Sequence, residues 1–338
     1  MDFFSILTML GGLALFLYGM DAMGQGLSRL SGGKMKRLLG KLTSNKIMAV
    51  LLGTGVTAVI QSSSATTVMV VGFVNAGLMK LSQAVGVIMG ANIGTTITSW
   101  FLSLAGIEGD SFLIRMLKPS SFAPVLAIIG VFLILFVKNQ RKKELGMILT
   151  GFAILMTGMD TMSGAVKPLA HNERFTGLLT MFSHPLLGMA AGTVITAVIQ
   201  SSSASIGILQ ALCATGAVGY DTAIPIIMGQ NIGTCVTAIL SSIGTGKNAR
   251  RAAAVHLYFN IIGTAIFLIT FYLCNAAFHF FFMFEAANAA GIAAIHSLFN
   301  ISATMLLLPF AGGLEKLAIL TIPDKKEQTG KKGNVSCH

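Results

Sequence analysis

The sequence predicts an all-α polytopic membrane protein with two inverted-topology repeats, each carrying a re-entrant helical hairpin with a Gln-Ser-Ser-Ser motif. The first observation is composition: of 338 residues, 54% are hydrophobic and 10% are charged, against about a quarter charged in soluble domains. The second is that the segments 47–79, 81–107 and 252–284 contain no Asp, Glu, Lys or Arg. Each exceeds the roughly 20 apolar residues that span a bilayer. The third is an internal repeat.

Positive charges indicate how the chain is oriented. The formal net charge is +11, and Lys and Arg gather in short connecting segments, at 29–46, 138–143, 247–251 and in the tail from 316. Basic loops of this kind face the cytoplasm. The pattern therefore favours the cell membrane as the location, with the N-terminus outside and the C-terminus in the cytoplasm. It argues against nucleic acid as a partner.

The repeat is visible as a shared string. Thr-Ala-Val-Ile-Gln-Ser-Ser-Ser-Ala occurs at 57–65 and again at 196–204, an offset of 139 residues. The same offset aligns Gly-x-Asn-Ile-Gly-Thr at 90–95 with 229–234, and 21 of the 47 positions from Gly53 to Ser99 match their counterparts. Composition alone would give only a handful of identities, so the chain contains a duplication.

The segment 47–79 predicts a re-entrant hairpin. As one helix it would be about 50 Å long, more than the roughly 30 Å of the hydrocarbon core. A hairpin at about 47–79, open to the cytoplasm, fits this length and the flanking charges. The basic loops then place its copy, at about 184–219, on the outer face, so that the repeats are inverted. About seven full crossings follow. The expected parts are the first repeat at 1–137, the second repeat at 138–274, an additional C-terminal membrane helix within 275–314 and a polar cytoplasmic tail at 315–338.

The two motifs, Gln61–Ser64 and Gln200–Ser203, fall at the hairpin tips. Polar groups and broken backbone at membrane depth are tolerated only where they are buried in protein or line a cavity. A half-helix that starts after each motif directs free N–H groups at that cavity, which suits an anion, while Gln and Ser oxygens also suit sodium. Asn92 and Asn231 are expected to line the same site.

The hairpins contain no Lys or Arg, and neither do 83–105 and 223–243. An anion would therefore rely on helix dipoles and co-bound cations. An inward-negative potential opposes anion uptake by about 2.3 kcal/mol per charge per 100 mV. The site chemistry thus favours cation-coupled uptake of an anion.

Other polar residues leave two interpretations open. Asp21 and Asp160 are symmetric acids that either serve function or lie at hydrated helix ends. A His-x-x-Phe-Asn pattern occurs at His256 and again at His296, where an interhelical hydrogen bond is favoured over a proton relay. The four cysteines have no metal-type spacing, so no metal beyond sodium is expected.

The paired Gln-Ser-Ser-Ser motifs, each followed by Gly-x-Asn-Ile-Gly-Thr, resemble those of the type II sodium/phosphate cotransporters, including the bacterial NptA-like branch. The resemblance covers nearly all of 1–320, and the segment from Arg250 to His256 also looks like the one that follows the second repeat in that family. It implies sodium-coupled symport of inorganic phosphate, with alternating access around a midplane site between the hairpins.

The resemblance also implies site residues and partners. The expected phosphate-binding residues are Gln61, Ser62, Ser63, Ser64, Gln200, Ser201, Ser202, Ser203, Asn92 and Asn231. The expected sodium-binding residues are Gln61, Thr66, Thr95, Gln200, Ser205 and Thr234. Because no PhoU-like domain follows the last membrane helix, regulation through such a domain is expected either to be absent or to be supplied in trans by a PhoU-like protein. A homodimer in the lipid bilayer is a further expectation.

Four alternatives remain. The carrier could export phosphate, use protons in place of sodium, or take another oxyanion such as sulfate. A protein of another class, a membrane phosphate sensor that does not transport, also fits. An enzyme acting on phosphorylated lipids would need a clustered nucleophile, base and metal ligands, which the motifs lack, so neither catalysis nor a cofactor is expected.

Overall fold

The computed structural model describes residues 3–31, 45–107 and 119–323. These residues form helices and connecting turns, with no strand among them beyond an isolated bridge between Gly219 and Ala286. Residues 32–44 of the predicted basic segment 29–46 and the end of the tail, 324–338, lie outside the described residues.

Within the described ranges, six helical segments are long and apolar enough to cross a membrane, or seven if the bent pair α9–α10 counts as one span. The helices on which the six are built are α1 (Phe3–Leu30), α5 (Leu81–Ser103), α8 (Gln140–Val166), α12 (Tyr220–Ser241), α13 (Lys247–Phe278) and α14 (Ala289–Leu307). This confirms the predicted all-α multi-pass class. Helix α7 (Pro119–Phe136), near the end of the predicted first repeat, is one of the shorter apolar helices.

The remaining helices are shorter. They are α3 (Lys46–Ile60), α4 (Ser63–Asn75), α9 (Glu173–Met181), α10 (Pro185–Ile199), α11 (Ser202–Cys213) and α15 (Ala311–Thr321), with 3-10 turns at Leu104–Gly106, Lys167–His171 and Phe281–Phe284. The bounds of α3 and α10 coincide when shifted by the 139 residues of the sequence repeat. The helix starts of α4 and α11, and of α5 and α12, coincide in the same way. The re-entrant and inverted arrangement itself stays a prediction.

Two helix pairs approach so closely that only glycine fits at the contact. A Cβ atom on Gly90 of α5 would overlap the Val50 carbonyl of α3, and one on Gly229 of α12 would overlap the Met189 carbonyl of α10. Such close approach of backbones is typical of small residues in membrane helices. Thr54 Oγ1 donates to the Gly90 carbonyl oxygen at 3.0 Å, so the α3–α5 contact is also hydrogen-bonded.

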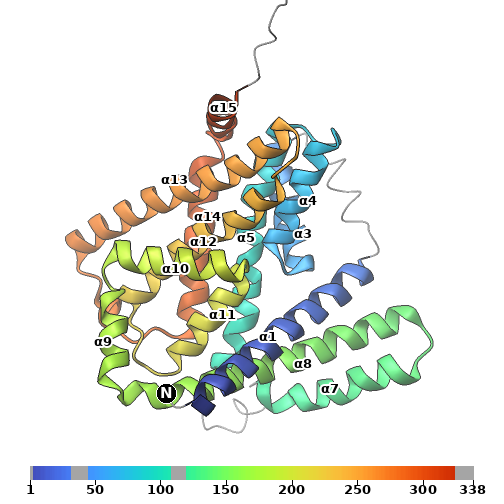
Figure 1. Ribbon diagram of the computed structural model, residues 1–338, viewed down its shortest axis with the longest axis vertical. Coiled ribbons are helices and arrows are strands. Elements are labelled where there is room, and N and C mark those ends of the chain that lie inside the picture. The colour runs from blue at the N-terminus through green and yellow to red at the C-terminus, as the bar shows by residue number, and fades with distance from the viewer. Residues whose placement is uncertain (1–2, 32–44, 108–118, 324–338) are drawn as a thin grey trace, which may run out of the picture.

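A separate group of helices lies to one side in Figure 1, where α1 and α7 flank α8. The α1–α8 contact is again glycine-lined: a Cβ on Gly158 would fall against the backbone of Phe16, and a Cβ on Gly12 would lie 2.9 Å from the Met162 nitrogen. Buried Phe16 also reaches Gly207 of α11. The α1–α8 pair therefore packs against the second motif's helix.

The C-terminal part differs from the expectation. Helix α14 ends at Leu307, and α15 continues past residue 315, where the polar tail was predicted to begin. Leu314 and Ala318 of α15 are buried, and Arg251 Nε donates to the Ile322 carbonyl oxygen at 3.0 Å. The buried residues lie on one face of this short helix, and its two charged residues, Glu315 and Lys316, are adjacent.

Candidate substrate and ion site

Each motif forms a break between two helices. Gln61 and Gln200 end α3 and α10 in the left-handed region, with φ of 60° and 58°. A non-glycine residue there is uncommon and mildly strained. Ser62 Oγ then accepts from the Ala65 nitrogen at 3.1 Å, and Ser201 Oγ accepts from Ala204 at 3.2 Å.

The serine caps start new helices inside the protein. Because the first N–H groups of α4 and α11 have no partner within their helix, each start carries a partial positive charge. The caps satisfy one N–H each and leave others for a ligand. The arrangement is thus able to bind an anion without a basic side chain.

The two motifs meet. Ser64 Oγ, in the first turn of α4, lies 3.5 Å from the Gln200 carbonyl oxygen and donates to it. Thr237 of α12 donates to the same oxygen at 3.4 Å. The structure therefore brings the two motifs, whose equivalent positions are 139 residues apart, into one polar cluster. Thr237 was not among the predicted site residues, although its match to Thr98 in the repeat was a usable signal.

The copies differ in exposure. Gln61 is 3% exposed, whereas its counterpart Gln200 is exposed. The Gln61 Nε2 donates to the Ala58 carbonyl oxygen, and its Oε1 is buried without a protein partner. Ser202 and Ser203 are both buried. The glutamine is therefore enclosed in the first motif and open in the second.

The hydrogen bonds of the hydroxyl groups also differ between the two repeats. Thr57 Oγ1 donates to Thr66 Oγ1 at 3.0 Å, and Thr66 Oγ1 donates to the Ser62 carbonyl oxygen at 3.1 Å. At the equivalent positions, Thr196 Oγ1 and Ser205 Oγ are buried and have no protein partner. The second repeat thus offers hydroxyl oxygens that the first repeat uses internally.

Polar residues of α5 and α12 follow the predicted positions. Asn92 and Asn231 are buried, and each Nδ2 donates to the carbonyl four residues earlier, at 3.4 Å and 3.0 Å. Thr95 and Thr234 likewise donate to their own helices, at 3.1 Å and 2.8 Å. Since each of these side chains donates a hydrogen bond to the backbone, its oxygen lone pairs stay available to a cation.

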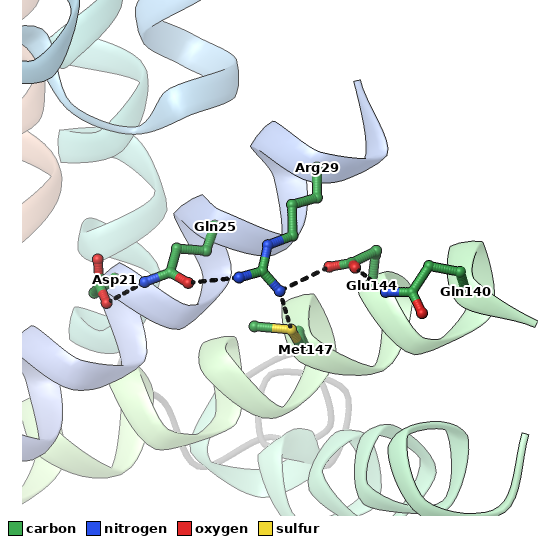
Figure 2. Close-up of polar contacts among 6 residues, drawn as sticks. All are labelled: Asp21, Gln25, Arg29, Gln140, Glu144 and Met147. Atoms are coloured by element: carbon green, nitrogen blue, oxygen red, sulfur yellow. Dashed lines mark hydrogen bonds and ion pairs between the residues drawn. The ribbon is translucent and has the colours of Figure 1, made fainter. Parts of the chain in front are cut away.

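Asp21 lies in a different network, shown in Figure 2. It accepts from Gln25 Nε2 at 2.7 Å, and Gln25 accepts from Arg29 at 3.4 Å. Arg29 reaches across to Glu144 of α8 with an N–O distance of 3.9 Å. Asp21 is exposed, so the side chain belongs to the α1–α8 contact and not to the motif cluster.

Asp160 lies elsewhere too. It lines a pocket together with Lys167, Gln210 and Asn288, and no motif residue lines that pocket. Among the described residues no group of three or more His, Cys, Asp or Glu could hold a metal. The two symmetric acids are therefore not brought to the candidate site.

The His-Asn pattern gives an interhelical contact, but not between its two copies. Asn260 Nδ2 of α13 lies 3.3 Å from Cys235 Sγ of α12, and Cys235 also approaches the His256 carbonyl oxygen at 3.5 Å. Both histidines of the pattern are buried. The second copy bonds only within its own helix, through Asn300 Nδ2 to the His296 carbonyl oxygen at 2.9 Å.

Comparison with known proteins relates the chain to phosphate carriers. The chain is 31% identical to "Uncharacterized protein YqeW" of Bacillus subtilis (strain 168), over 93% of this chain and 97% of that protein. It is 26% identical to "Putative inorganic phosphate export protein YjbB" of Escherichia coli (strain K12), over 96% of this chain but 57% of that protein. No solved structure matches.

A shorter match links the chain to animal proteins. It is 37% identical to "Sodium-dependent phosphate transport protein 2A" of Rattus norvegicus over 99 residues, which is 28% of this chain and 15% of that protein. The sequence profile described as Na+/Pi-cotransporter matches twice, over residues 15–164 and 154–296. The chain belongs to the Na+/Pi-cotransporter family.

Proposed function

We propose that the protein carries inorganic phosphate across the cell membrane in symport with sodium, by alternating access at the cluster formed by the two Gln-Ser-Ser-Ser motifs. Family membership supports phosphate as the substrate. The observation that carries the site is the contact between Ser64 Oγ and the Gln200 carbonyl oxygen, because it joins the two motifs.

Phosphate would bind at the starts of α4 and α11. Serine hydroxyls and free N–H groups donate to its oxygens, and the helix dipoles favour its negative charge. The segments 47–79 and 184–219 contain no Lys or Arg. The remaining charge is therefore to be balanced by cations that bind with phosphate.

Sodium would bind to oxygens close to the phosphate. Ser205 Oγ and Thr196 Oγ1 are buried acceptors without a protein partner, and Thr234 has a free lone pair. Neutral hydroxyl and carbonyl oxygens are hard ligands that suit sodium. A loaded complex that is neutral or positive avoids the cost of about 2.3 kcal/mol per charge per 100 mV that opposes entry of a lone anion.

Export is the second candidate function, and the name of the Escherichia coli relative favours it. A carrier with the same site runs in either direction, according to the gradients of its ligands. For the orientation we propose an external N-terminus and a cytoplasmic C-terminus, as the basic segments indicate.

Radiolabelled phosphate uptake into proteoliposomes tests substrate and coupling together. Uptake is expected to require sodium outside and to fail when choline replaces it at constant pH. Sulfate in excess should not compete. Uptake that is equal in choline, or that follows an imposed pH gradient alone, would refute sodium coupling.

A further inference from the structure

Gln210 joins the helix of the second motif to two other helices, and it is not part of the proposed substrate site. It belongs to α11 and is 3% exposed. Its Nε2 donates to the Ser99 carbonyl oxygen of α5 at 3.1 Å and to the Ala289 carbonyl oxygen of α14 at 3.0 Å. Since an amide nitrogen has two hydrogens, both are used, and each bond joins α11 to a different helix.

The two acceptor helices contact each other without Gln210. A Cβ atom on Gly106, in the 3-10 turn that continues α5, would lie 2.7 Å from Ala289 Cβ, so the end of α5 touches the start of α14. Trp100 Nε1 of α5 donates to Ser297 Oγ of α14 at 3.0 Å. The bonds of Gln210 therefore attach α11 to a pair of helices that is already joined.

Gln210 lies near the end of α11 that is remote from the motif. Helix α11 begins at Ser202, eight residues before Gln210, which corresponds to about 12 Å along a helix. The backbone hydrogen bonds of a short helix make it move as a unit. The attachment at Gln210 thus also determines where the free N–H groups at Ser202 point.

A pocket lies beside these bonds. Its volume is about 410 Å³, and its wall includes Gln210, Cys213, Asp160, Lys167 and Asn288. Asp160 and Lys167 are exposed, whereas Cys213 is 8% exposed. The attached end of α11 therefore borders open space, and Cys213 lies in the wall between that space and the protein interior.

The first repeat has no equivalent of these bonds. The residue 139 positions before Gln210 is Val71 of α4, which is 2% exposed. A valine side chain has no hydrogen-bond donor, so position 71 cannot attach α4 in the same way. The two half-helices that follow the motifs are thus held differently.

We propose that Gln210 is a positioning residue that holds α11 in the state described here and releases it when the carrier changes state. The Gln210 latch denotes its two hydrogen bonds to Ser99 and Ala289. Alternating access moves one repeat or bundle against the other. An attachment present on only one half-helix stabilises one state over the other, so the populations of the states depend on it. The alternation rests on the proposed function, whereas the attachment of α11 does not.

The amide of Gln210 contributes little net stability. Its Oε1 is buried without a protein partner, and this loss partly offsets the two bonds of Nε2. Methionine is close to glutamine in shape and lacks both polar groups. Gln210→Met is therefore expected to remove the latch and to change the melting temperature little.

Alkylation of Cys213 in the purified full chain, without phosphate, tests the latch. Cys213 lies about one helical turn after Gln210 and lines the same pocket, so release of α11 exposes its thiol. Labelling by N-ethylmaleimide is followed by mass spectrometry of the peptide that contains Cys213. It should be about fivefold faster in Gln210→Met than in the native chain, the effect of one net hydrogen bond. Cys235 of α12 is fully buried and is the internal control, which should label at the same slow rate in both proteins.

Two results of the labelling would overturn the proposal. An unchanged rate at Cys213 in the folded variant would show that Gln210 does not restrain α11. Equal acceleration at Cys213 and Cys235 would show a general loosening of the fold. If Gln210→Met does not fold, Gln210→Asn replaces it, because an amide one methylene shorter does not keep both bonds. Failure of both variants to fold would show that Gln210 serves folding alone and would also overturn the proposal.

Phosphate flux measured on the same proteins separates the latch from the proposed function. Loss of the latch should change severalfold the ratio of the phosphate concentrations for half-maximal uptake and half-maximal efflux, because apparent affinity follows the population of the competent state. Equal loss of rate in both directions with an unchanged ratio would overturn the latch. Native protein that carries no phosphate, with labelling as expected, refutes the proposed function only. Native flux with an unchanged Cys213 rate in the variant refutes the latch only.

Discussion

The hydroxyl of Ser64 donates to the backbone carbonyl oxygen of Gln200 at 3.5 Å, and this contact joins two motifs that lie 139 residues apart in the repeat. Ser64 belongs to the first turn of α4, and Gln200 ends α10. A long hydrogen bond of this kind is easily exchanged for one to a ligand. The contact therefore lies at the position where the substrate is proposed to bind and to exchange with it.

Substitution of Ser64 by Ala should reduce phosphate transport more than it reduces stability. The variant loses a donor at the meeting point of the motifs, and we expect a fall of about tenfold in kcat/KM, close to the 1.4 kcal/mol of one hydrogen bond. Initial rates of phosphate uptake measure this. Thr161→Ala, which loses a hydroxyl bonded to its own helix, is the control and should transport normally. Equal rates in both variants would contradict the prediction.

Thr66 and Ser205 occupy equivalent positions but should respond differently. Thr66 is bonded to Thr57 and to Ser62, so Thr66→Ala should lower the melting temperature. Ser205 Oγ has no protein partner, so Ser205→Ala should leave melting nearly unchanged and raise the sodium concentration needed for half-maximal transport severalfold. Melting curves together with sodium titrations of flux decide this. Equal changes in melting temperature and in sodium dependence for both variants would show that the two positions are equivalent.

Gly90 should not tolerate a side chain. A Cβ there would overlap the Val50 carbonyl of α3, whereas a Cβ on Gly55 meets nothing within 4 Å. Gly90→Ala is therefore expected to cost about 1–3 kcal/mol or more, since it overpacks a close helix contact. Gly55→Ala should be neutral or slightly stabilising, because alanine favours the helix. Thermal unfolding in detergent compares them, and similar melting temperatures would show that the α3–α5 contact is looser than described.

The ion pair between Arg29 and Glu144 predicts which of two single substitutions destabilises the protein more. Glu144 is 4% exposed and also accepts from Gln140 at 2.6 Å, while the Arg29 side chain is 55% exposed. Arg29→Met leaves a buried carboxylate without its counter-charge and should destabilise more than Glu144→Gln, which keeps the hydrogen bond. The difference should be about 1 kcal/mol, because the arginine is solvated.

The double variant Arg29→Met, Glu144→Gln completes the cycle. It should recover most of the stability that Arg29→Met loses, since no unpaired buried charge remains. A double variant less stable than either single variant would show that these residues act independently. Chemical or thermal unfolding of the four proteins gives the comparison.

Sequence patterns predicted the helices of the repeat well. The polar centre at Gln61 and Gln200 gave the helix breaks, because Gln-Ser-Ser-Ser interrupts an apolar segment that is too long for one span. The all-α class followed from composition. The uneven use of hydroxyls at Thr66 and Ser205 was visible only as a difference in residue type.

The tertiary contacts could not be predicted from the sequence. Thr237 of α12 donates to the Gln200 carbonyl oxygen at the end of α10. Asp21 is hydrogen-bonded to Gln25, which bonds to Arg29, and does not contact the motifs. Both depend on the rotation of a helix about its axis, which alternation of polar and apolar residues does not fix in helices buried on several sides. Helix α15 was missed because it is only 11 residues long and carries Glu315 and Lys316, which are typical of a polar tail.

Sodium-driven accumulation of phosphate in proteoliposomes tests the central claim most directly. An inward sodium gradient should drive phosphate above its external concentration, and a reversed gradient should drive phosphate out. Ser63→Ala or Ser202→Ala should abolish both while the protein stays folded. Accumulation that is independent of the sodium gradient, or unchanged in both serine variants, would contradict a sodium-coupled site built from the two motifs.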